Sequence, residues 1–185
     1  MGGGGGSASP SNTGANQVAV ATGGAGGGYC RKTFSATTIG ASQSVTIGSG
    51  GAANLSGGNS AFGVLLTANG GGPGNNGGAG AGSSAVGAAG GTATGGDINI
   101  AGQSTNEVGT IWNSTGIITA VSPGGGSVLG LGGASSFWTS STHTLYSGTG
   151  YGAGGGGSTI NDNVSSITGG SGTAGVCIIT EFISN

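Results

Sequence analysis

Residues 69–96 read NGGGPGNNGGAGAGSSAVGAAGGTATGG and contain almost nothing but Gly, Ala, Ser, Asn and Thr. Such a stretch has too few large side chains to build a conventional hydrophobic core. Glycine at this density is also costly in helices and ordinary strands, because it loses more backbone freedom on folding than any other residue. We expect polyproline II segments packed against one another, since glycine has no Cβ to hold neighbouring backbones apart. A long mobile loop is the alternative.

The rest of the chain has the same character, with 51 glycines among 185 residues. Disorder is typical of chains with high net charge and few apolar residues, whereas here the net charge is -2 and 34% of residues are hydrophobic. Glycine runs at 2–6, 70–72 and 154–157 exclude the strict third-position repeat of collagen. The sequence therefore predicts a mostly β or irregular fold, in which short antiparallel strands combine with packed glycine-rich polyproline II segments and essentially no α-helix.

Apolar stretches between the glycine runs predict the strands. They lie at residues 17–21, 29–36, 43–47, 61–68, 97–101, 110–121 and 128–131, and the most hydrophobic is 175–183. Residues 1–16 predict a flexible or extended glycine-rich lead-in, and residues 17–185 a single domain. Segments richer in large side chains predict three loops inserted in this domain, at about 103–121, 134–147 and 158–168.

Catalytic chemistry has little support in the residues. The single histidine, His143, lies among Ser and Thr, and the four carboxylates are mostly far apart in the sequence. No phosphate-binding loop and no nucleophile elbow occurs. We therefore expect no enzyme and no cofactor.

Other binding classes are also disfavoured. The only basic residues besides the histidine are Arg31 and Lys32, too few to neutralise a nucleic-acid backbone. No apolar run approaches the roughly 18 residues of a membrane span. The two cysteines, Cys30 and Cys177, favour free thiols over a disulfide, and with a single histidine they predict no structural zinc site.

The order of several short motifs resembles the glycine-rich C-terminal domain of tailed-bacteriophage tail fibres, from about residue 17 onward. The motifs are GGAGGGYCRKTF at 23–34, SVTIGSGG at 44–51, NSAFG at 59–63, GDINIAG at 96–102, GTGYGAGGGG at 148–157 and GTAGVCIITEF at 172–182. No single motif is specific, and the likeness rests on their order. Residues 103–121 and 135–147 depart from the glycine runs typical of such domains.

The resemblance implies a receptor-binding adhesin at the distal tip of a fibre in the virion, which mediates attachment to the host. It also implies a homotrimer joined to the rest of the tail fibre, and a bacterial surface receptor that is an outer-membrane protein or a surface glycan. Fibres of this kind assemble in the host cytoplasm and leave by lysis, which fits the absence of a signal-peptide pattern after Met1.

Aromatic residues supply large contact area at low entropic cost, and Ser and Thr neighbours supply adaptable hydrogen bonds. The receptor-binding candidates on this ground are Phe137, Trp138, His143 and Tyr146, followed by Trp112, Asn113, Asp162 and Asn163. Core packing is the alternative role for each aromatic residue. For the whole chain, one alternative is a purely structural spacer or trimerising fibre tip. Another is an ice-binding protein, which needs a flat, regular array of Thr or Ala, and the irregular spacing in this sequence disfavours it.

Overall fold

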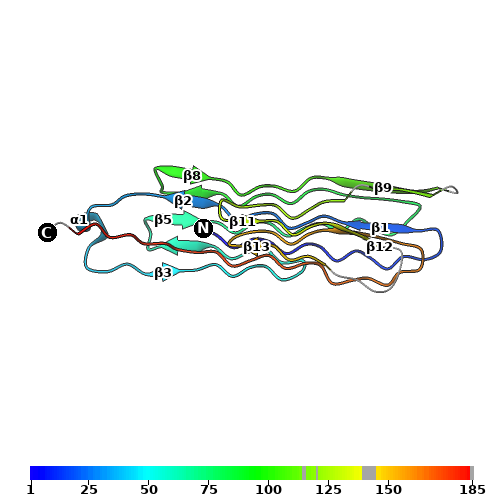
Figure 1. The fold of residues 1–185 in the computed structure, drawn as a ribbon, viewed down its shortest axis with the longest axis horizontal. Helices are drawn as coiled ribbons and strands as arrows, with labels where there is room; N and C mark the ends of the chain where they lie inside the picture. Colours follow the sequence, from blue (N-terminus) through cyan, green and yellow to red (C-terminus); the bar gives the residue numbers. More distant parts are fainter. Residues whose placement is uncertain (114–115, 120, 139–144, 184–185) are drawn as a thin grey trace.

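The computed structural model covers residues 1–185 and describes all of them except 114–115, 120, 139–144 and 184–185. The chain forms an elongated rod and runs back and forth along its axis in extended passes (Figure 1). Glycine-rich segments fill the middle of the rod, and short β-strands lie mostly toward its two ends. This arrangement confirms the predicted mostly β, irregular fold class.

The described residues contain one helical turn and short strands. They are β1 (Val18–Ala21), β2 (Tyr29–Arg31), α1 (Ala36–Ile39), β3 (Val45–Thr46), β4 (Ser60–Phe62), β5 (Leu66–Ala68), β6 (Gly82–Ala85), β7 (Ala93–Thr94), β8 (Ile98–Ile100), β9 (Val108–Asn113), β10 (Gly116–Thr119), β11 (Gly130–Leu131), β12 (Ser136–Trp138), β13 (Thr149–Gly150) and β14 (Ser158–Asn161).

The strands form small, separate sheets. One end of the rod carries the sheet β3-β4-β5-β7 and the pair β2-β8, and the other end carries the sheets β1-β14-β12 and β10-β9-β6. Every strand pair is antiparallel except β12 with β14. We call the two ends the pocket end, which includes residues 29–32 and 176–183, and the hairpin end, which includes the β9–β10 hairpin.

Hydrogen bonds along residues 2–8 rotate among three neighbouring segments. The amides of residues 2, 5 and 8 donate to carbonyls in segment 22–28. Those of residues 3 and 6 donate to segment 55–58, and those of residues 4 and 7 to segment 170–173. A partner that returns every third residue is the pattern expected of polyproline II, which has three residues per turn and leaves every amide free to bond outward. Residues 22–28 bond in the same rotating way.

Three passes form the centre of the rod: residues 1–8, 18–28 and 152–161. All of their residues are buried. They bond to one another in a triangle, since Gly5 N donates to Ala25 O, Gly24 N to Gly155 O, and Gly155 N to Gly5 O, at 2.9 to 3.0 Å. The remaining passes surround this triangle, so no position in the middle of a central pass faces solvent.

This geometry explains why glycine comes in unbroken runs at the centre. A Cβ added to Gly5 would lie 2.0 Å from Gly72 O, and neighbouring central glycines are equally close to backbone atoms. Outer passes differ, because every third side chain points to solvent. One such row is Leu131, Ala134 and Phe137, which are exposed while Gly133 and Ser136 between them are buried.

Conventional side-chain cores are small and lie toward the hairpin end. One cluster joins Ala19 and Ile160, which face each other across β1 and β14, to Val164 and Ile167. A second cluster consists of Val20, Ala85 and Val108, contributed by β1, β6 and β9. The strands at this end are therefore fixed by apolar packing as well as by backbone bonds.

The structure corrects the domain organisation predicted from the sequence. Residues 1–8 are not a lead-in outside the domain, because they are one of its three central passes. The predicted loop at 158–168 begins with the fully buried strand β14. In the predicted loop at 103–121, Gln103 belongs to the bundle through its bond from Gly26 N, and β9 and β10 form a hairpin. In the predicted loop at 134–147, Ser136 N donates to Gly157 O.

Two strand predictions also need correction. Residues 175–183 form no strand in their described part, because only Gly175 and Val176 find backbone acceptors, Gly48 and Met1. The stretch 61–68 is a hairpin of β4 and β5 instead of one strand, with Gly63 in the turn at φ 52°. By contrast, the prediction at 17–21 is confirmed by β1.

Candidate functional site

Five of the eight receptor-binding candidates lie together at the hairpin end. Trp112 N donates to Ala81 O, and the adjacent Gly80 pairs with Val18. Val18 pairs with Asn161, directly before Asp162 and Asn163. Trp138 pairs with Ile160 in the same sheet. These pairings place residues 112–113, 138 and 162–163 at one end of the rod, although they come from three distant parts of the sequence.

Asp162 and Asn163 make the turn after β14. Both have left-handed backbone conformations, φ 46° and 62°, which Asn and Asp tolerate better than most residues. Asp162 N donates to Gln17 O and Asn163 N to Gly14 O, and the Asp162 carboxylate accepts from Asn16 N at 3.2 Å. The two exposed side chains thus belong to a turn that is fastened to residues 14–17.

The described aromatic candidates are partly exposed. Phe137 is 39% exposed in β12, and Tyr146 is 46% exposed. Gly156 N donates to Tyr146 O, whereas Phe137 pairs with Thr159, so Tyr146 lies about three residues farther from the hairpin end than Phe137 does. Trp112 is half-buried. Neither Phe137 nor Tyr146 is therefore buried in the core.

The remaining candidates are described only in part. His143 lies outside the described residues, and of Asn113 and Trp138 only the backbone is described. Asn113 ends β9 and pairs with Gly116 across the hairpin.

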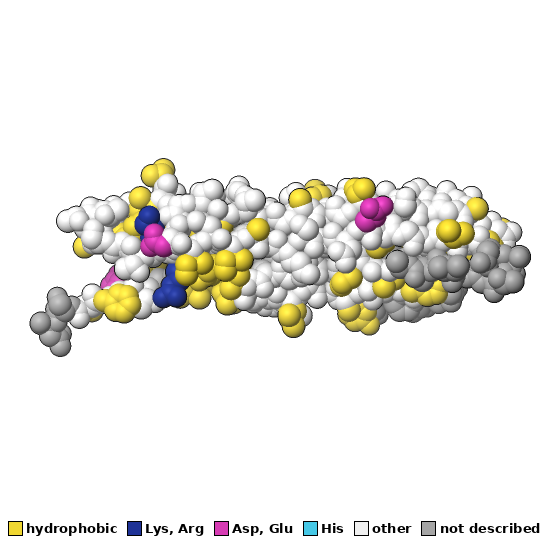
Figure 2. All heavy atoms as spheres, turned by 90° about the horizontal axis from the view of Figure 1, so that it is seen from above, with side chains coloured by type: hydrophobic (Ala, Val, Ile, Leu, Met, Phe, Trp, Pro, Cys, Tyr) yellow, Lys and Arg dark blue, Asp and Glu magenta, His cyan; other side chains and the backbone are white. Residues whose placement is uncertain are grey.

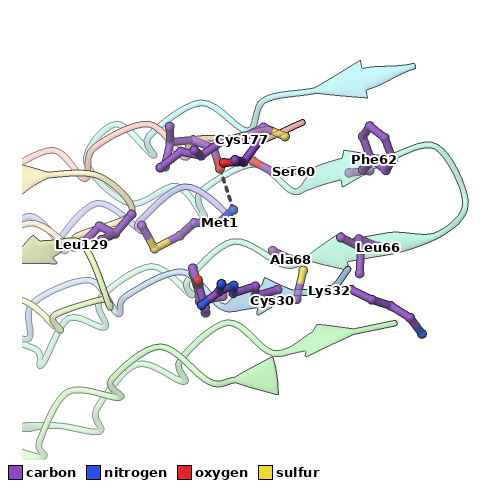
Figure 3. Close-up of a pocket in the computed structure, with 15 residues that line it drawn as sticks. Met1, Cys30, Lys32, Ser60, Phe62, Leu66, Ala68, Leu129 and Cys177 are labelled. Atoms are coloured by element: carbon purple, nitrogen blue, oxygen red, sulfur yellow. Dashed lines mark hydrogen bonds between the residues drawn. The ribbon is translucent and has the colours of Figure 1, made fainter. Parts of the chain in front are cut away.

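The pocket end holds a second site that the sequence did not predict. A pocket of about 350 Å³ opens between β2, β4, β5 and the C-terminal segment (Figure 3). Its walls are mainly apolar, and it is lined by Met1, Tyr29, Cys30, Arg31, Lys32, Ser60, Ala61, Phe62, Leu66, Ala68, Leu129, Val176, Cys177, Ile178 and Thr180. Phe34 stacks on Phe62 at a ring distance of 6.2 Å and extends this apolar surface.

Both cysteines face this pocket, and both are free and half-buried. Burial raises the pKa of the Cys30 thiol, against the lowering effect of the nearby Met1 α-amino group. Burial also lowers the pKa of that amino group, which donates to Val176 O at 2.7 Å. Both shifts favour uncharged groups beside the pocket. No cluster of three His, Cys, Asp or Glu side chains suited to a metal ion occurs in the described part of the chain.

Charged and apolar side chains gather around the pocket. Figure 2 shows the Lys and Arg side chains beside hydrophobic ones near the end that carries the C-terminus. Lys32 Nζ lies 3.6 Å from the Asp97 carboxylate and 5.6 Å from the ring of Phe34. The C-terminal segment adds four strongly exposed apolar residues, Ile178, Ile179, Phe182 and Ile183. The apolar run at 175–183 was the sequence signal for this surface, but it predicted a strand instead.

No family model matches the chain, and no curated protein is significantly similar to it. Among the described residues, none of the helices has the length and apolar character needed to cross a membrane.

Proposed function

We propose that the chain is the host-receptor-binding tip of a bacteriophage tail fibre and attaches the virion to the bacterial surface through its hairpin end. The observation that carries the proposal is the gathering of residues 112–113, 138 and 162–163 at one end of a rod whose middle is almost all backbone. A rod with varied side chains gathered at an end suits the presentation of a binding surface. The resemblance of the sequence to glycine-rich fibre-tip domains supports the same role.

The receptor in this proposal is an outer-membrane protein or a surface glycan. Exposed aromatic side chains such as Phe137 suit either, because they bury large area and stack on sugar or apolar faces. The chain has only six formal charges, so long-range attraction contributes little to the encounter. As in the fibres that the sequence resembles, the tip would act as a homotrimer on the rest of the fibre.

The test is binding of the purified chain to whole cells of a panel of bacterial strains and their surface-receptor deletion mutants. Saturable binding to one host, lost in one deletion strain, supports the proposal. Within that assay, Phe137→Ser and Trp112→Ser should weaken binding about tenfold or more, as expected of aromatic anchors. Leu131→Ser is the matched control, because Leu131 is 75% exposed in the same outward row as Phe137 but farther from the hairpin end.

A purely structural fibre tip is the second candidate, and the exposed apolar surface at the pocket end favours it. A spacer needs an attachment surface and no receptor site. In that case no strain of the panel binds the chain saturably, and Phe137→Ser leaves adsorption of the phage unchanged.

A further inference from the structure

The C-terminal segment 178–183 leaves the bundle without backbone partners. Within the described residues, none of its amides or carbonyls takes part in a backbone hydrogen bond, whereas Val176 still bonds to Met1. In Figure 1 the red end of the chain continues past α1. Phe182 is 88% and Ile183 85% exposed. An exposed apolar segment with unpaired backbone groups is a ready template for contact with another chain.

The charges at this end include a cation and an anion that are complementary between two copies of the chain. Lys32 and Asp97 pair with each other. Arg31 and Glu181 are both exposed, and neither has an ion-pair partner in the described part of its own chain. Arg31 lines the pocket, and Glu181 lies directly before Phe182 on the projecting segment. A segment that enters the pocket of a second copy thus brings an unpaired carboxylate toward an unpaired guanidinium.

The pocket fits such a segment in size and character. Its volume of about 350 Å³ exceeds that of one large apolar side chain, and Phe62, Leu66 and Tyr29 among its walls suit an aromatic or branched side chain. Ile178 and Thr180 of the segment line the pocket of their own chain, but Phe182 is almost fully exposed and does not fill it.

We infer that copies of this chain associate at the pocket end, each seating the Phe182 segment of one copy in the Met1–Tyr29–Phe62 pocket of another, with Glu181 beside Arg31 of the second copy. The inference stands on these contacts and not on the proposed receptor-binding role. Pocket and segment lie at the same end of the rod, so a reciprocal pair and a closed ring of copies both satisfy the same contact.

The experiment measures the mass of the 185-residue chain against concentration by sedimentation equilibrium. Wild type is expected to self-associate at micromolar concentration. Phe182→Ser should raise the dissociation constant about tenfold or more, as loss of a central anchor does. Val86→Ser, which removes an exposed apolar side chain directly after β6 of a hairpin-end sheet, should leave the constant unchanged. Thermal unfolding of each variant checks that the fold is retained.

Charge reversal identifies the partner surface. Arg31→Glu alone and Glu181→Arg alone each place like charges together and should weaken association, whereas a chain with both changes should associate nearly as wild type does. An equimolar mixture of the two single variants should also associate more strongly than either alone. A wild-type chain that stays monomeric at about 100 μM overturns the inference, because this concentration is well above the micromolar dissociation constant that the inference expects. So does a double variant that is no better than the single ones.

Discussion

Gly154 packs so closely on Gly24 that a Cβ on Gly154 would lie 1.9 Å from the Gly24 carbonyl oxygen. Gly154→Ala must therefore separate two central passes. We expect it to lower the free energy of unfolding by about 3 kcal/mol or more, the upper end of what overpacking costs. Urea denaturation followed by circular dichroism measures this loss. Gly78→Ala, with nothing within 4 Å of the added Cβ, should change stability by less than about 1 kcal/mol, and equal losses in both variants would contradict the packing.

Deletion of residues 1–8 should abolish folding, because it removes a buried central pass and leaves the amides and carbonyls of the surrounding passes without partners. The expected result is loss of cooperative thermal unfolding and of soluble yield. A deletion variant with the melting temperature of the full chain would show that these residues are a lead-in after all.

Two substitutions at Asn163 should separate its role in the left-handed turn from a role in receptor binding. Its φ of 62° suits glycine, so Asn163→Gly should keep the turn, whereas Asn163→Val should destabilise the chain by about 1–2 kcal/mol. Denaturant titration of the two variants measures the difference. If Asn163→Gly is as stable as wild type but loses binding to cells, the Asn163 side chain belongs to the receptor surface. If the Gly and Val variants are equally stable, the left-handed turn geometry is refuted.

The pH at which Cys30 becomes reactive toward alkylation should show that this thiol is partly buried. Burial raises the pKa of this thiol, so the reactive thiolate forms at higher pH in the folded chain than in the unfolded one. With Cys177→Ala present, the rate of iodoacetamide labelling isolates Cys30. The midpoint of the rate profile should move to lower pH when the same variant is unfolded in urea. Coinciding midpoints would place Cys30 in solvent.

The raised pKa of Cys30 also determines in which direction this thiol changes the unfolding free energy with pH. Because the folded-state pKa of Cys30 is raised, the unfolded chain loses its proton first as pH rises, so this thiol favours folding at neutral pH and less so in the alkaline range. Cys30→Ala should therefore flatten the alkaline fall in unfolding free energy, as measured by urea titrations from neutral to alkaline pH. An unaltered alkaline slope would mean that other groups cause it.

The fold class was readable from the sequence because it depends on composition, but the centre of the rod was not. In an outer pass, solvent allows a larger side chain at every third position, as at Leu131, Ala134 and Phe137. In a central pass all three directions meet backbone, so Gly2–Gly6 shows no period and has the composition of a flexible tail. Only the bonds to residues 22–28, 55–58 and 170–173 distinguish a central pass from a flexible tail, and these residues lie far away in the sequence.

The candidate site was predicted in part. Trp112, Asp162 and Asn163 do lie at one end of the rod, but sequence gives no measure of how the passes align along the axis. The left-handed turn at Asp162 was not predicted, although Asp-Asn is a pair that tolerates such a turn. The pocket was missed because its walls come from residues 1, 29–32, 60–68, 129 and 176–180, which no local pattern connects.

The central position of residues 2–7 also constrains how the chain folds. Gly4 N bonds to Thr173 O and Ser7 N to Gly170 O, so the innermost pass is closed by a segment more than 160 residues later in the chain. Contacts this distant in sequence make folding slow, because a large loop must close before they contribute. Until residues 170–173 leave the ribosome, the glycine run at the centre has an open side. The native rod therefore requires residues 170–173, and a fragment that stops before this pass lacks the bonds that close it.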